Sequence, residues 1–132
     1  MTSKSLISSL SLLVAVATVQ AADVDVSKLP PASKQTGVTY AKDIKPIFEK
    51  ACFKCHGAEK QKGKLRLDNL AAALKGGEDG PDIVAGNSAK SKLVHSIARL
   101  NEDEAMPPAD KGKPLSKDEV GLVRAWIDQG AK

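Results

Sequence analysis

The stretch that decides the fold reads DIKPIFEKACFKCH and runs from Asp43 to His56. Asp43 suits the N-terminal cap of a helix, and Pro46 then falls in the first turn, where its missing N–H costs nothing. Apolar residues recur at helical spacing through Ile44, Ile47, Phe48 and Ala51. The pattern predicts a helix that leads directly into two cysteines and a histidine.

Those three residues, Cys52, Cys55 and His56, form a Cys-x-x-Cys-His pattern, which is typical of covalent haem attachment. Residues three apart on a helical turn share a face, so both thiols can reach the vinyl groups along one haem edge, with His56 held under the iron. A thioredoxin-like pair would follow a strand, and a zinc site would need four ligands. Neither context is present in the sequence, so we expect one covalently bound haem c.

The sixth iron ligand follows from counting. The chain has two methionines and two histidines, and Met1 would leave with an export signal. Met106 precedes two prolines in a polar loop, a setting that suits a thioether reaching over a haem better than a methionine filling a core. His95 falls inside an expected helix, where we interpret it as a half-buried or surface residue. Met106 is therefore the predicted distal ligand, with open or solvent-bound iron as the remaining alternative.

Three segments organise the chain. Residues 1–21 have a weakly positive start, an apolar run and small residues at the end, which predicts a cleavable export signal; an uncleaved membrane anchor is the alternative. The run is shorter than a spanning helix needs, so no stable membrane insertion is expected after cleavage. Residues 22–38 show no apolar period and are predicted to be a flexible segment, which leaves residues 39–132 as the domain.

Within this domain the boundary signals predict four short helices separated by long loops. After the first helix, Asp68 opens a segment that Gly76 closes, and Asn87 or Ser88 caps a helix extending to Leu100. Ser116 and Glu119 form a capping box for the last helix, which Gly130 ends. No pair of strands is evident, so the predicted fold class is all-α.

Charge is unevenly distributed. Without residues 1–21 the chain has 19 basic and 16 acidic side chains, an excess too small to indicate a nucleic-acid partner. Residues 42–66 hold eight basic and three acidic side chains, so positive charge gathers around the cysteines. This indicates either a solvated lysine-rich face or a surface that steers the protein toward an acidic redox partner.

The chain resembles class I cytochrome c, and more closely the planctomycete-type cytochrome c domain, in seven segments: 43–48, 52–57, 63–68, 80–81, 91–93, 106–108 and 126–131. The resemblance implies a cytochrome c-like fold in which the first helix, Ile44 to Cys55, crosses the last, Ser116 to Gln129, near the haem edge. It also implies Met106 as distal ligand. Arg66 is expected near a haem propionate, because a guanidinium pairs bidentately with carboxylates; a plain surface arginine is the alternative.

The predicted function is outer-sphere electron transfer with redox partner proteins, by a monohaem c-type cytochrome that is periplasmic or otherwise exported. No separate nucleophile, base or substrate pocket is evident in the sequence, so we do not predict an enzyme. Two alternatives use the same motif. One is a haem sensor or weak peroxidase with a displaceable sixth ligand, and the other is an electron-transfer module that docks onto a larger oxidoreductase.

Overall fold

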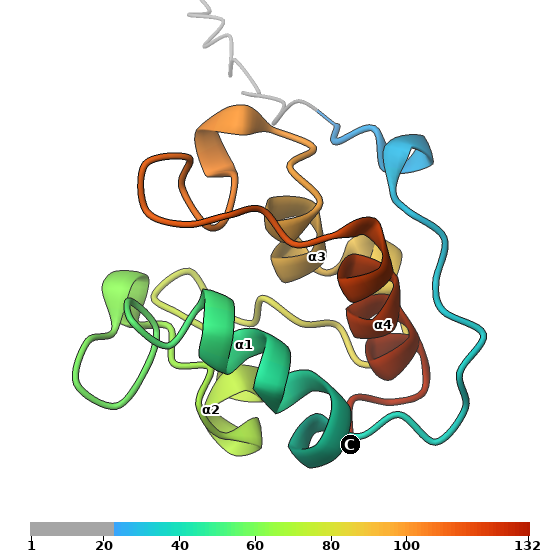
Figure 1. Ribbon diagram of the computed structural model, residues 1–132, viewed down its shortest axis with the longest axis horizontal. Coiled ribbons are helices and arrows are strands. Elements are labelled where there is room, and N and C mark those ends of the chain that lie inside the picture. The colour runs from blue at the N-terminus through green and yellow to red at the C-terminus, as the bar shows by residue number, and fades with distance from the viewer. Residues whose placement is uncertain (1–22) are drawn as a thin grey trace, which may run out of the picture.

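Within residues 23–132, four short α-helices joined by long loops make up the fold (Figure 1). The computed structural model describes residues 23–132. The helices are α1 (Lys45–Ala51), α2 (Leu70–Lys75), α3 (Lys92–Ile97) and α4 (Lys117–Asp128). A π-helical turn precedes α1 at Tyr40–Ile44, and 3-10 turns lie at Val26–Lys28, Lys62–Lys64, Ser88–Lys90 and Glu102–Glu104. Residues 23–132 contain no β-strand, which confirms the predicted all-α class.

The predicted export signal, residues 1–21, lies outside the described residues. Among residues 23–132, no helix has the length and apolar character needed to cross a lipid bilayer.

The first helix begins earlier than its sequence signals predict. Thr39 is the residue before the π-helical turn, and the Asp43 carboxylate accepts a hydrogen bond from its backbone N–H at 2.9 Å. Asp43 therefore secures the helix start from inside the first turn, and the predicted cap at this residue is wrong. The wide turn passes into α1 where Lys45 N–H bonds to the carbonyl of Tyr40, and Pro46 follows in the first turn of α1. The α-helix ends at Ala51, not at Cys55.

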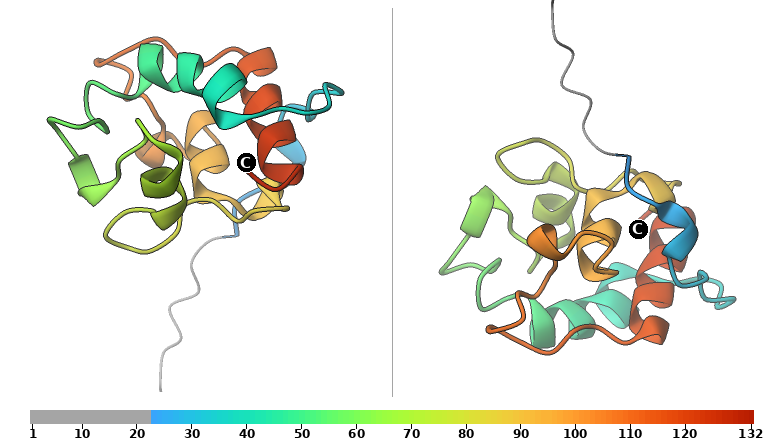
Figure 2. Two further views of the ribbon diagram at one scale, coloured as in Figure 1. Left: turned by 90° about the horizontal axis from the view of Figure 1, so that it is seen from below. Right: turned by 90° about the horizontal axis from the view of Figure 1, so that it is seen from above.

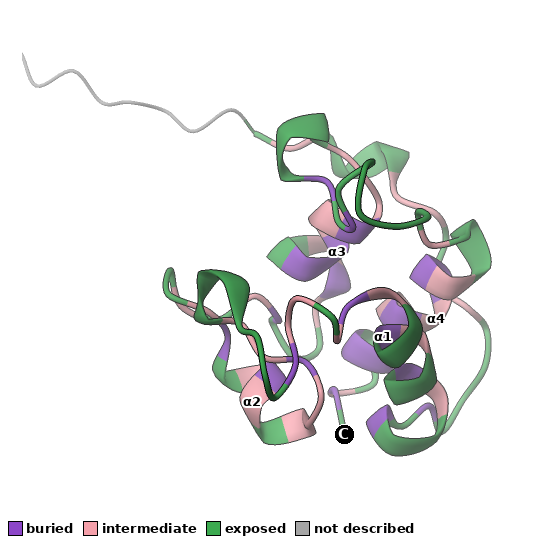
Figure 3. Cartoon of the chain, turned by 60° about the vertical axis from the view of Figure 1, so that its left-hand side comes forward, coloured by how far each residue is buried: buried purple, intermediate pink, exposed green. Residues whose placement is uncertain are grey.

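Three aromatic side chains join the first and last helices in the core. The ring centroid of Trp126 lies 6.0 Å from that of Tyr40 and 6.2 Å from that of Phe48, in tilted and edge-to-face arrangements. Trp126 and Phe48 are fully buried, and edge-to-face pairs of this kind add roughly 0.5–1.5 kcal/mol to what burial contributes. Figure 3 shows buried residues on α1, α3 and α4. The resemblance implies that the first and last helices cross, and they contact each other at this cluster.

The last helix has the predicted boundaries. Glu119 N–H donates to Ser116 Oγ at 3.1 Å and Ser116 N–H donates to Glu119 Oε2 at 2.8 Å, which completes the capping box. At the other end Gly130 adopts φ 104°, a conformation that favours glycine. The apolar face of α4, which includes Val120, Val123 and Ile127, is buried.

The two middle helices differ from their predicted bounds. Asn69, not Asp68, caps α2, because its side chain accepts from Ala72 N–H at 2.8 Å while Asp68 pairs elsewhere. Asn87 caps only the 3-10 turn, through a bond from Lys90 N–H at 3.1 Å, and α3 begins after Ser91. The predicted single helix to Leu100 is therefore wrong.

Residues 23–38, which we call the N-terminal strap, run along the outside of α4 (Figures 1 and 2). Ser33 N–H donates to Gly121 O at 2.9 Å, and the Arg124 guanidinium donates to Pro30 O. Gln129 closes the far end, donating to Gln35 O at 2.8 Å and accepting from Val38 N–H at 3.2 Å. In place of the predicted flexible lead-in, the structure shows a bound segment, and Val38 itself belongs to the core. The domain therefore extends N-terminal of residue 39.

Candidate functional site

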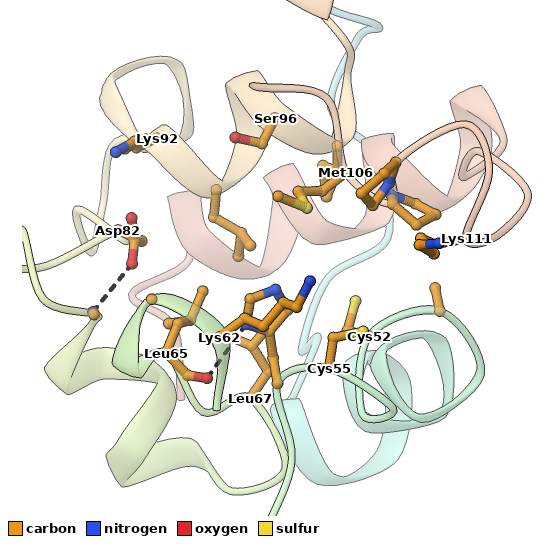
Figure 4. Close-up of a pocket in the computed structure, with 18 of the residues that line it drawn as sticks. Cys52, Cys55, Lys62, Leu65, Leu67, Asp82, Lys92, Ser96, Met106 and Lys111 are labelled. Carbon is orange, nitrogen blue, oxygen red and sulfur yellow. Dashed lines mark hydrogen bonds between the residues drawn. The ribbon is translucent and has the colours of Figure 1, made fainter. Parts of the chain in front are cut away.

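A cavity of about 580 Å³ lies between the end of α1 and α3 (Figure 4). One wall comes from the segment after α1, with Cys52, Cys55 and His56, and from the extended piece at residues 65–67. The other wall comes from α3 and from the loop that starts at Met106. The cavity thus brings together four of the five predicted site residues, and Arg66 is not among the residues that line it.

The two cysteines enter the cavity from a helical turn that continues past α1. Cys55 N–H and His56 N–H both donate to the carbonyl of Cys52, at 3.1 and 2.9 Å, which keeps the thiols and the imidazole on adjoining positions. Both side chains are free thiols. Burial raises the pKa of the Cys52 thiol to about 12, so it stays protonated at neutral pH. A dithiol redox pair needs the opposite shift in pKa, which disfavours that interpretation.

His56 is oriented by a backbone carbonyl. Its Nδ1 lies 3.3 Å from the carbonyl oxygen of Leu65, and the adjoining Leu67 N–H donates to His56 O at 2.8 Å. A carbonyl can only accept, so the bond assigns the ring proton to Nδ1 and leaves the Nε2 lone pair available for a metal. Second-shell bonds of this kind are typical of metal-binding histidines. The role of Leu65 O was not predicted, since a backbone acceptor has no sequence signature.

Met106 reaches the cavity from a loop that is fastened to α3. Its N–H donates to Ser96 O at 3.0 Å, and the next carbonyl, of Pro107, accepts from Arg99 Nη1 at 3.1 Å. The Met106 side chain stays 37% exposed, unusual for an apolar residue of this size in the domain. Ser96 and Arg99 were not singled out by the sequence analysis, although both fix the height of this loop over the cavity.

Arg66 and the alternative ligand His95 are not among the residues that line the cavity. Arg66 forms a bidentate pair with Asp68, Nε to Oδ1 at 2.5 Å and Nη2 to Oδ2 at 3.0 Å, and the pair lowers the pKa of the Asp68 carboxyl. A contact between Arg66 and a propionate would require it to give up this partner. His95 Nε2 lies 2.7 Å from the carbonyl of Ala89, so that nitrogen is already engaged. His95 therefore serves as a half-buried helix histidine, as interpreted from the sequence.

Charged side chains divide the cavity rim into two ends of opposite sign. Around Cys55 lie three lysines and one aspartate, a net charge of +2: Lys54, Lys62, Lys111 and Asp110. The other end carries one lysine and two acidic groups, a net charge of −1: Lys92, Asp79 and Asp82. Glu78 lies between the two ends, since its N–H donates to Gly63 O at 2.8 Å. Backbone and ion-pair contacts support this division, since Lys62 N–H donates to Cys55 O at 2.9 Å and Lys92 Nζ lies 3.7 Å from Asp79 Oδ2. Figure 4 shows Lys92 and Asp82 on one side of the cavity and Lys111 on the other.

The side chains that line the cavity fit the predicted haem. Between the thiols and the thioether the walls are apolar, formed by Leu65, Leu67, Leu93 and Ile97, and the volume lies within the range usual for cofactor sites. Residues 23–132 contain no cluster of three or more histidine, cysteine or acidic side chains able to hold a metal ion. The donor set therefore suits a flat apolar group with one metal at its centre.

Comparison with known protein families agrees with this donor set. Residues 52–110 match the family model described as planctomycete cytochrome C. Searches of curated proteins and of solved structures found no match. The matched segment starts at the first cysteine of the cavity and ends just past Met106, so it contains both walls described above. Residues 52–110, which form both walls of the cavity, are therefore similar to the planctomycete cytochrome C family.

Proposed function

We propose that this protein is a monohaem c-type cytochrome that carries single electrons, with His56 and Met106 as axial ligands. A cytochrome c domain indicates covalent haem c and haem-based electron transfer, and the single Cys-x-x-Cys-His motif of this chain supports one haem. When bound, the haem supplies an iron that cycles between Fe(III) and Fe(II). The donor set and its geometry support the residue roles that follow.

The observation that carries the proposal is the pair of donors on opposite walls. His56 offers Nε2 because Leu65 O engages Nδ1, and Met106 offers its thioether from the loop held by Ser96 and Arg99. An imidazole and a thioether together favour Fe(II) more than two nitrogen ligands do, which raises the reduction potential. Cys52 and Cys55 would form the thioether bonds to the vinyl groups, fixing the cofactor even if an axial bond exchanges.

The test replaces the proposed distal ligand while keeping its shape. The substitution Met106→Leu retains an apolar side chain of similar volume and removes the sulfur, and His95→Gln serves as the matched control at the other candidate ligand. Both are produced in a host that matures c-type cytochromes, and covalent haem is checked on denaturing gels. We expect Met106→Leu to abolish the weak long-wavelength band that a methionine–Fe(III) bond produces, whereas His95→Gln leaves it unchanged.

An unchanged low-spin spectrum in Met106→Leu would refute Met106 as the ligand. A high-spin spectrum in the unmodified oxidised protein would instead favour a sensor or weak peroxidase with a displaceable sixth ligand.

We propose that an acidic redox partner docks at the positive end of the cavity rim. Lys54 and Lys62 line the cavity there, beside the cysteines that would hold the haem. Reversing both charges is expected to slow electron transfer to an acidic partner at low ionic strength and to have little effect at high salt. The matched control is the double reversal of Lys34 and Lys117, exposed lysines that do not line the cavity.

We further propose that the protein works after export, as the predicted signal implies, and that it acts as a carrier and not as an enzyme. Cytochrome c domains are typically exported, which supports the first point. The N-terminal residue of the purified protein tests it, because cleavage would leave Ala22 first. Steady-state assays for peroxidase activity test the second.

A further inference from the structure

The two ends of the cavity would meet different parts of a bound haem. This inference rests on the proposed function. Vinyl and propionate groups occupy opposite edges of the porphyrin, so thioether bonds to Cys52 and Cys55 would direct the propionates toward the far end of the cavity. That end carries Lys92, Asp79 and Asp82. The propionates would therefore add negative charge where the protein already has a net charge of −1.

At this end of the cavity, Lys92 is the one cation among the lining residues that the structure describes. Lys92 is the first residue of α3, and Leu93 and Ile97 of the same short helix form the apolar wall beside it. Its ammonium group lies 3.7 Å from Asp79 Oδ2, with the two side chains 51% and 82% exposed. Exposed pairs of this kind contribute little and exchange readily, so Lys92 can turn to another carboxylate at small cost.

Arg66, unlike Lys92, is not easily released from its partner. Its two bonds to Asp68 are short and bidentate, and it does not line the cavity. Moving it to a propionate would break both bonds and leave Asp68 without its cation. Arg66, which the resemblance places near a propionate, is therefore already paired with Asp68. The cation at the acidic end is Lys92, which comes from α3.

We propose that Lys92 pairs with a haem propionate and thereby raises the reduction potential of the iron. A positive charge beside the haem edge favours Fe(II), the form with one less positive charge, and it offsets the repulsion from Asp79 and Asp82. Removal of the ammonium group shifts the equilibrium toward Fe(III). The expected change in the Fe(III)/Fe(II) ratio at a fixed applied potential is on the order of three- to tenfold.

The experiment compares four holoprotein variants: Lys92→Gln, Lys92→Arg, Lys90→Gln and Arg66→Gln. Lys90 is the matched control, an exposed lysine two positions away that does not line the cavity. Each variant is first checked for covalent haem and for the absorption of the unmodified oxidised protein. The readouts are the midpoint potential and the propionate bending band in the resonance Raman spectrum, which responds to hydrogen bonding at the carboxylate.

We expect Lys92→Gln to lower the potential and shift the propionate band, Lys92→Arg to restore both, and Lys90→Gln and Arg66→Gln to leave the band in place. A band shift in Arg66→Gln without one in Lys92→Gln would overturn the assignment in favour of Arg66. Equal effects of Lys92→Gln and Lys90→Gln would reduce Lys92 to a general surface charge and would also overturn it. Absence of covalent haem from the unmodified protein would refute the proposed function itself.

Discussion

The substitution Gly121→Ala tests how the N-terminal strap is held on α4. Gly121 lies in the middle of α4 and faces the strap, and a Cβ at this position would come within 2.7 Å of Pro31 O and 3.5 Å of Ser33 N. The nearer distance is too short for a carbon–oxygen contact, and the obstacle is backbone, which cannot rotate away. The strap must therefore shift or detach.

The expected size of the effect combines three contributions. Alanine is favoured over glycine in a helix interior by about 1 kcal/mol. Against this stand an overpacking cost of about 1–3 kcal/mol and the loss of the Ser33 N–H to Gly121 O bond, worth about 1 kcal/mol. The net expectation is a loss of about 1–3 kcal/mol in the free energy of unfolding.

Denaturant unfolding and amide hydrogen exchange measure the two parts of this prediction. Gly121→Ala should lower the unfolding midpoint and remove the exchange protection of the Ser33 amide. In a chain that lacks residues 23–36, the same substitution should raise stability by about 1 kcal/mol, because only the helix preference is left. If Gly121→Ala stabilises the full chain and Ser33 remains protected, the close packing of strap and helix is not as described.

Three further predictions concern single contacts. Tyr40→Phe removes the 2.7 Å bond to the carbonyl of Leu67 and should lower the free energy of unfolding by about 1–3 kcal/mol. Because burial raises the pKa of Tyr40 to about 12, the contribution of this hydroxyl to stability is full below pH 10 and declines from there to pH 12. The difference between the two proteins in urea unfolding should therefore shrink over that interval. Ser116→Ala removes the helix cap and should cost about 1 kcal/mol, measured by the same unfolding assay. In Arg66→Gln, the pKa of Asp68 should rise toward its ordinary value in an NMR titration, and an unchanged pKa would mean that the pair does not persist in solution.

The elements that sequence patterns predicted well are those whose signals are local. The capping box of α4 and the glycine after it are properties of neighbouring residues, and the structure reproduces both. The same holds for Cys52, Cys55 and His56, whose spacing alone puts them on one turn. Met106 could be nominated by counting, but its position over the cavity depends on Ser96 and Arg99, which no motif marks.

The elements that were missed depend on contacts distant in sequence. The helix predicted from Asn87 breaks because Ser88 is held by Asp128, through its N–H at 2.7 Å and its hydroxyl at 3.0 Å, which ties that turn to the end of α4. The strap was predicted to be flexible because it lacks an apolar period, yet most of its anchoring bonds use backbone groups, which leave no mark on the sequence. Arg66 is different, because the carboxylate that competes for it, that of Asp68, is only two positions away in the sequence.

The carbonyl of Leu65 that orients His56 has a consequence for how such proteins diverge. Every residue type has a backbone carbonyl and can supply this acceptor. For this bond, the side chain at position 65 can therefore change in chemistry while the imidazole keeps its tautomer. What must persist is the path of the chain from residue 57 to residue 64, since that loop determines whether the oxygen arrives within reach. Insertions or deletions in this loop would therefore disturb the orientation of His56, the proposed axial ligand, more than substitutions at position 65 would.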